Sequence, residues 1–237
     1  MKKQDLFRRA FRLKESDCTI ISDKEDTIEK AISSIEHHRK QLEKYVQDHP
    51  EFLYSLQPVP VDKGPEVARL MAEASLKANV GPMAAVAGVL ADLAVEDMIH
   101  AGSKVAVVEN GGEVSAISNQ PIDIALAAGD APLSREMGFR LKEFPVGVAT
   151  SSGLFSHALS FGEAEAVTVF GVDAGVADAA ATAVANLIKG DYVRGVIREG
   201  IDEALGIEGV KGVFILYRGV VGKAGEVPEL IKVNPQE

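Results

Sequence analysis

The sequence predicts a mixed α+β fold in which antiparallel strands pack against helices. Short apolar segments suited to strands alternate with amphipathic or alanine-rich helical segments along the 237 residues. Several of these strands are joined as hairpins, which favours an antiparallel sheet, because parallel neighbours need long crossover connections. We expect one domain over residues 1–237, divided at most into an N-terminal lobe of about residues 1–60 and a core of 61–237 that holds the ligand site.

The first quarter of the chain predicts a hairpin, a long helix and a linker. Residues 11–22 alternate around a Glu-Ser-Asp turn, which is typical of a hairpin. Residues 23–52 place apolar side chains near helical spacing until Pro50, which ends the helix because proline lacks a backbone N–H. Residues 56–65 contain three of the ten prolines, and we interpret them as a linker.

The remaining elements follow from apolar periodicity and from glycine and proline boundaries. Gly81 and Pro82 separate two helices, and Asn110-Gly111-Gly112 forms a hairpin turn between two strands. The predicted helices cover about residues 65–78, 82–99, 174–189 and 192–205. The predicted strands cover residues 104–109, 113–118, 121–127, 144–150 and 165–172, followed by a strand–turn–strand segment at 212–225.

Composition excludes several classes of function. The net charge of −10 repels phosphate backbones, and with 5% aromatic residues and no Trp the chain offers little for base stacking, so we expect no nucleic-acid partner. Cys18 is the single cysteine, which fits a reducing compartment. The N-terminus lacks the apolar run of a signal peptide, and the most apolar window, residues 81–102, is interrupted by Asp92, Glu96 and Asp97. We therefore expect a cytoplasmic protein without a membrane span.

A polar stripe crosses the alanine-rich helix. Asp178, Thr182 and Asn186 are spaced four residues apart, so they share one helix face at about 5–6 Å intervals. One interpretation is structural: Asp178 favours the helix dipole near its start, and Thr182 bonds back to a carbonyl. The other is a hard-cation site, because Mg²⁺ accepts a carboxylate and a hydroxyl and takes further oxygens from phosphates. The residues alone leave both interpretations open.

Two glycine-containing turns could form the other wall of such a site. The Gly111-Gly112 turn is either a plain hairpin or a place where a ligand approaches the backbone. The loop that follows residues 144–150 is either a plain turn or an anion-binding nest of backbone amides. His157 is either a loop histidine or a general base within reach of the site.

Taken together, the segments "AGVLAD", "ENGGEV", "VATSSG…H" and "AVTVFGVDAGVADAAATAVAN" resemble the signature of the ApbE-like superfamily of FAD:protein FMN transferases. This resemblance covers roughly residues 80–190 and implies a T-fold-like α+β architecture. The segments "HPEFLYSLQPVP" and "VGPMAAVAG" resemble still more closely an uncharacterised archaeal and bacterial branch of that superfamily, the UPF0280 group.

The resemblance implies a bound flavin nucleotide, FAD or FMN, whose pyrophosphate is held by Mg²⁺. Asp178 and Thr182 match the side-chain ligands of the metal, and Ala84 falls where a backbone carbonyl completes the set. His157 matches the base that would deprotonate an acceptor hydroxyl. The residues that match the flavin-nucleotide turns are Asn110, Gly111, Gly112, Thr150, Ser151, Ser152 and Gly153.

The sequence also departs from the transferase pattern. Ala87-Gly88 replaces a lysine–glycine pair, and "LSFGEAEA" replaces a proline–threonine–glycine segment after the histidine. Three hypotheses follow. The first is a Mg²⁺-dependent enzyme that transfers FMN or hydrolyses the FAD pyrophosphate. The second is a non-catalytic carrier of a flavin or another phosphate-bearing ligand, and the third is a scaffold with an empty site.

Overall fold

The computed structural model describes residues 6–126, 137–152 and 162–233. Its helical elements are α1 (Glu25–Asp48), α2 (Pro50–Tyr54), α3 (Glu66–Ala78), the 3₁₀ turn η1 (Pro82–Ala85), α4 (Val86–His100), α5 (Ala174–Leu187) and α6 (Val193–Gly206). Its strands are β1 (Phe7–Leu13), β2 (Ser16–Ser22), β3 (Ala106–Asn110), β4 (Glu113–Ile117), β5 (Ile122–Ala125), β6 (Met137–Leu141), β7 (Val146–Ser151), β8 (Ala166–Gly171), β9 (Val210–Tyr217), β10 (Val220–Gly225) and β11 (Glu229–Lys232).

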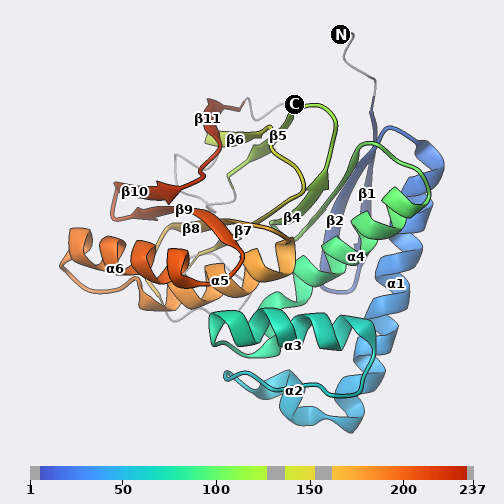
Figure 1. Cartoon of the computed structure of the whole chain (residues 1–237), viewed down its shortest axis with the longest axis horizontal. Coiled ribbons are helices and arrows are strands. Elements are labelled where there is room, and N and C mark those ends of the chain that lie inside the picture. Colours follow the sequence, from blue (N-terminus) through green and yellow to red (C-terminus); the bar gives the residue numbers. More distant parts are fainter. Residues whose placement is uncertain (1–5, 127–136, 153–161, 234–237) are drawn as a thin grey trace.

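An antiparallel sheet of eight strands, in the order β1-β2-β3-β4-β7-β8-β9-β10, forms the central layer. The helices lie along one side of it, and a small sheet in the order β11-β6-β5 lies on the other (Figure 1). The N-terminal hairpin belongs to the large sheet, because β2 pairs with β3. The predicted mixed α+β class with antiparallel strands is confirmed.

Strand β8 is buried throughout because both of its faces are covered. Val167 and Val169 contribute to the core beneath α5 and α6, whereas Ala166 and Phe170 contribute to the core beneath the small sheet. Successive side chains of a strand point to opposite faces, so a strand between two layers shows no polar alternation. A third core lies between α1, α4 and strands β2 and β3.

The structure corrects several predicted boundaries. The first hairpin turns at residues 14–15, one position before the expected Glu-Ser-Asp turn, with Lys14 at φ 53°. Pro50 ends the long helix as expected and also begins α2. Strands β6 and β11 were not predicted. Both belong to the small sheet, where Gly138 approaches the neighbouring strand so closely that an added Cβ would lie 2.2 Å from the carbonyl oxygen of Ile124.

Among the described helices, none is by itself both long and apolar enough to cross a membrane. Only the bent pair Glu66–Ala78 and Pro82–His100 reaches that composition jointly, with an angle of 101° between its parts.

Candidate functional site

The N-terminal turns of α4 and α5 touch backbone to backbone. A Cβ added to Gly88 would lie 2.2 Å from the carbonyl oxygen of Ala174, and one added to Gly175 would lie 2.6 Å from Cγ2 of Val89. Glycine at both positions therefore allows the two helices to approach more closely than side chains would permit. This contact brings the polar stripe of α5 beside the start of α4.

Two aspartates join these turns in opposite directions. Asp92 of α4 accepts the amides of Ala174 (3.0 Å) and Gly175 (2.8 Å), which begin α5. Asp178 of α5 accepts the amide of Gly88 at 3.0 Å in the first turn of α4. The first amides of a helix have no intrahelical partner, so each aspartate satisfies donors that the other helix leaves open. We call this arrangement the α4–α5 clasp.

The polar stripe is the half-buried face of an otherwise packed helix. Asp178, Thr182 and Asn186 are each half-buried, whereas most of the remaining α5 residues are buried. The Asp178 carboxylate bonds to α4 and not to the start of its own helix, where Asp173 is the local cap and accepts the amide of Val176. The observed bond therefore differs from the helix-dipole interpretation of Asp178.

The strand β3 ends against α4 through a buried amide. The Asn110 side chain is 3% exposed, and its Nδ2 donates to the carbonyl oxygen of Ala87 at 3.1 Å. The Cys18 thiol donates to Asn110 Oδ1 at 3.4 Å. Asn110 thus ties the β3–β4 turn to the first turn of α4.

The predicted Gly111-Gly112 turn is present, with φ of 73° and 118°. Positive φ at both central residues is characteristic of the type I′ hairpin turn, which favours glycine. The amide of Gly111 donates to the carbonyl of Asp17, and the amide of Gly112 donates to Glu109. Both amides therefore bond within the protein, so a ligand at this turn would contact the turn without receiving these two hydrogen bonds.

Asp92 and Glu113 both lie close enough to Asp178 for their charges to interact, and each of the three carboxyl groups has a raised pKa. Burial raises the pKa of Asp178 to about 7, against the effect of the Gly88 and Ala87 amides. Burial, followed by the charge of Asp173, raises the pKa of Asp92 to about 7. The pKa of Glu113 is well above its ordinary value because its carboxyl group is shielded from water and lies near Asp178.

Within the described part of the chain, none of Asp92, Glu113 and Asp178 forms an ion pair with a lysine or arginine. Shielded carboxylates without a counter-charge are costly, and a bound cation would relieve that cost. The residues predicted as metal ligands fit a hard cation: Asp178 and Thr182 lie one turn apart, and Ala84 lies in η1, which contacts α5. Carboxylate, hydroxyl and carbonyl oxygens are ligands that Mg²⁺ accepts.

A carboxylate offers about four lone-pair positions, so the amide bonds to Asp178 leave room for a cation. Among the residues the structure describes, no group of three His, Cys, Asp or Glu side chains is placed to hold a metal. A cation here would therefore depend on the hydroxyl, the backbone carbonyl and oxygens of the ligand itself.

The other predicted site residues are only partly described. The Thr150 hydroxyl lies 2.9 Å from that of Thr168 across the β7–β8 pair, Ser151 is half-buried, and Ser152 is buried. Strand β7, which carries the first two, contacts α5. Gly153 and His157 lie outside the described residues, and their roles stay predictions.

Sequence reasoning did not assign a site role to Asp92 or Glu113. An acid inside the apolar segment "VAGVLADLAV" is the signal that could have identified Asp92. The position of Glu113 directly after the two glycines is the corresponding signal for the second carboxylate.

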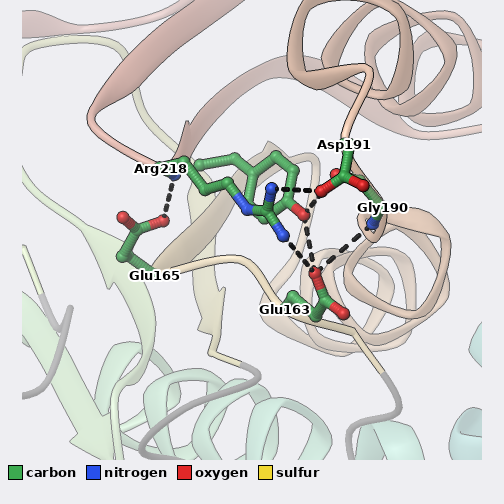
Figure 2. Close-up of polar contacts among 6 residues, drawn as sticks. Glu163, Glu165, Gly190, Asp191 and Arg218 are labelled. Carbon is green, nitrogen blue, oxygen red and sulfur yellow. Dashed lines mark hydrogen bonds and ion pairs between the residues drawn. The ribbon is translucent and has the colours of Figure 1, made fainter.

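A separate polar cluster stabilises the β9–β10 turn. Figure 2 labels its members Glu163, Glu165, Gly190, Asp191 and Arg218, and the Tyr217 hydroxyl donates to Glu163. Arg218 pairs with Asp191 at 2.8 Å and with Glu163 at 3.3 Å. Its amide donates to Glu165 at 2.7 Å. Arg218 supplies a counter-charge to these carboxylates, so the cluster stabilises the turn.

Comparisons with known proteins agree with this architecture. A family model described as "AbpE bacteria" matches residues 1–205. A UPF0280 protein of Methanococcus vannielii is 37% identical over 238 residues, which cover 98% of this chain and 96% of that protein. A UPF0280 protein of Methanocaldococcus jannaschii is 38% identical over 233 residues, covering 96% of this chain and 94% of that protein.

Solved structures share the fold at lower identity. The ApbE protein of Thermotoga maritima aligns with a TM-score of 0.66 at 14% identity, covering 93% of this chain and 97% of that one. The apo form of the flavinyl transferase ApbE of Pseudomonas stutzeri aligns with a TM-score of 0.64 at 17% identity, covering 95% and 96%. The predicted ApbE-like fold is confirmed.

Proposed function

This chain belongs to the bacterial AbpE family, and we propose that it binds a flavin nucleotide together with Mg²⁺ and cleaves the FAD pyrophosphate. The observation that carries the proposal is the convergence of Asp178, Glu113 and the first turn of α4 around an uncompensated negative charge. A divalent cation shared with a pyrophosphate supplies the missing positive charge. The names of the structural neighbours, which describe flavin transferases, support the flavin as ligand.

Each residue of the site has a proposed part. Asp178 and Thr182 hold the cation, with the carbonyl of Ala84 as a third protein ligand. The turn at Gly111 and Gly112 and the end of β7, with Thr150, Ser151, Ser152 and Gly153, form the wall against the flavin nucleotide. Bound Mg²⁺ supplies charge neutralisation at the pyrophosphate.

The proposed reaction breaks the bond between the FMN phosphorus and the oxygen that bridges the two phosphorus atoms of FAD. An oxygen nucleophile attacks that phosphorus and AMP leaves with the bridging oxygen. With water as nucleophile the products are FMN and AMP; with a protein hydroxyl they are a flavinylated protein and AMP. His157 is the predicted base that takes the proton from the nucleophile.

Water is the favoured nucleophile, because the chain departs from the transferases where these handle a protein substrate. Ala87 stands where the resemblance places a lysine, and residues 159–166 replace the proline–threonine–glycine segment. The Ala87 carbonyl is occupied by Asn110. The absence of that lysine at Ala87 also favours a second candidate function, in which the protein holds the flavin nucleotide without cleaving it.

The deciding experiment incubates the purified protein with FAD, with Mg²⁺ or with EDTA, and separates FAD, FMN and AMP by chromatography. We expect Mg²⁺-dependent release of FMN and AMP in equal amounts. Asp178→Ala should abolish both Mg²⁺-dependent binding and release, whereas His157→Ala should abolish release and retain binding. Bound FAD without AMP would select the carrier, and no binding at all would leave the scaffold. Normal binding by Asp178→Ala would refute the metal assignment.

A further inference from the structure

The start of α5 is held from two sides. Asp173, the local cap, satisfies the third and fourth amides of the helix: its carboxylate accepts from Val176 at 2.7 Å and its carbonyl accepts from Ala177 at 3.3 Å. The first two amides, of Ala174 and Gly175, are left to the carboxylate of Asp92. All four open donors of α5 are thereby satisfied, two of them by Asp92, which is 82 and 83 positions away in the sequence.

The two bonds from Asp92 do more than satisfy donors. One carboxylate that bonds two successive amides through separate oxygens fixes both the distance and the direction of α5 relative to α4. A cap that only satisfied donors could come from the local chain, as Asp173 does, without placing a shielded charge inside α4. Asp92 therefore sets how far α5 can slide or rotate against its neighbour.

The same contact determines where Asp178 lies. Asp178 is four residues after Ala174, and its bonding partner Gly88 is four residues before Asp92. The two ends of the clasp are thus one helical turn apart on both helices. Because a Cβ at Gly175 would meet Val89 at 2.6 Å, the spacing between the turns is also sterically defined.

A hard cation is sensitive to such placement. Mg²⁺ requires ligand oxygens at about 2.0–2.1 Å in near-octahedral geometry, so a shift of α5 by a fraction of an ångström alters the fit. Thr182 lies on α5 and Ala84 in η1, on the α4 side of the clasp. The relative position of the two helices therefore decides whether their oxygens meet at one ion.

From this geometry we infer that Asp92 is a positioning residue for the cation site: by holding the amides of Ala174 and Gly175 it places Asp178 and Thr182 against η1. The inference rests on the cation site of the proposed function. It assigns to Asp92 no contact with the cation or the flavin. Residues that orient metal ligands typically change metal affinity by about 10–100-fold when replaced.

The test uses Mn²⁺ as the probe, with free Mn²⁺ counted by electron paramagnetic resonance during titration of the full chain. We expect wild type to bind one Mn²⁺ and Asp92→Asn to bind it at least about 10-fold more weakly. Asp173→Asn is the matched control, since it removes a charge at the same helix start yet keeps an N-cap side chain. The Mn²⁺ affinity of Asp173→Asn should stay within about two-fold of wild type, because a loss of ligand orientation would lower the affinity by about 10-fold or more.

A second variant separates position from charge. Gly175→Ala changes no charge and displaces α5 from Val89, so it should weaken Mn²⁺ binding as Asp92→Asn does. Near-UV circular dichroism and thermal unfolding in EDTA report whether each variant is folded, and Gly175→Ala carries the test if Asp92→Asn does not fold.

The outcomes distinguish the two proposals. If Asp178→Ala loses Mn²⁺ binding while Asp92→Asn and Gly175→Ala keep it within two-fold of wild type, the positioning role is refuted and the cation site stands. If Asp173→Asn weakens binding as much as Asp92→Asn while Gly175→Ala does not, local charge explains the effect and the positioning role is again refuted. If wild type and Asp178→Ala bind Mn²⁺ alike, or neither binds it, the cation site itself fails and the inference fails with it.

Discussion

Asp92 and Asp178 cap each other's helices: Asp92 on α4 accepts the first two amides of α5, and Asp178 on α5 accepts the amide of Gly88 in the first turn of α4. The glycines at the contact allow the backbones to come close enough for these bonds. The same bonds therefore stabilise the helix pair and position Asp178, the predicted metal ligand. A mutation on either helix can test the contact.

Gly88→Ala should destabilise the protein strongly. The new methyl group would lie 2.2 Å from the Ala174 carbonyl oxygen, and backbone displacement of this kind costs about 2 kcal/mol or more. The measurement is the free energy of unfolding by urea titration. Gly206→Ala is the control, because nothing lies within 4 Å of its added Cβ and alanine favours helices by up to about 1 kcal/mol over glycine. Equal stability of Gly88→Ala and wild type would contradict the close helix contact.

Asn110→Ala should lower the free energy of unfolding by about 1–3 kcal/mol, because the carbonyl of Ala87 would lose its buried donor. The exposed Asn119 provides a matched control, and its replacement by alanine should change stability by less than about 0.5 kcal/mol. FAD affinity measured on both variants also tests the predicted cofactor role of Asn110. A variant that keeps its stability and loses only FAD binding would show that Asn110 acts on the ligand and not on the fold.

Glu113→Gln should weaken Mg²⁺ binding and stabilise the metal-free protein above neutral pH. The folded-state pKa of Glu113 is raised by burial and by Asp178, so its stabilising contribution is complete below the unfolded pKa of about 4.3 and is lost as pH rises through the folded value. Glutamine does not ionise, so the variant does not lose this stability as the pH rises. In EDTA, the melting temperature of Glu113→Gln should exceed that of wild type at pH 8 and match it near pH 4.

The exposed Glu208 supplies the control for that comparison, and Glu208→Gln should leave both the pH dependence and the Mg²⁺ affinity unchanged. If Glu113→Gln melts below wild type at pH 8, the negative charge of the Glu113 carboxylate is already offset in the metal-free protein. The charge argument for the cation site would then fail.

Cys18 should resist alkylation in the folded protein. Burial raises the pKa of its thiol to about 12, with further contributions from Glu109 and Asp17, and the side chain is 1% exposed. Only the thiolate attacks iodoacetamide, so intact mass spectrometry at pH 8.5 should show unmodified native protein and full labelling in urea. Rapid labelling of the native protein would indicate that the contact between β2 and Asn110 opens frequently.

Much of the fold follows from local sequence. The periodicity of residues 25–48, the proline at position 50 and the paired glycines 111–112 each specify a backbone conformation through neighbouring residues. Strands β6 and β11 escaped prediction because they are short, and because their pairing with each other joins residues about ninety positions apart.

The candidate site divides in the same way. The spacing of Asp178 and Thr182 predicts one shared helix face, and in the structure both residues are half-buried on α5. Their match to the metal ligands of the family, and the roles of His157 and the β7 loop, stay predictions. Nothing in the neighbourhood of Asp92 or Glu113 along the chain specifies a partner for either carboxylate.

The sequence by itself determined the helices, the hairpins and the polar stripe, because these depend on side-chain spacing and on backbone preferences within a few residues. Only the tertiary structure decided that Asp92 bonds to α5 and that Asp178 bonds to α4. It also decided that burial and the nearby charge of Asp178 raise the pKa of Glu113. The physical reason is range: hydrogen bonds and charge interactions depend on distance in space, and these partners meet only after the sheet and helices have packed.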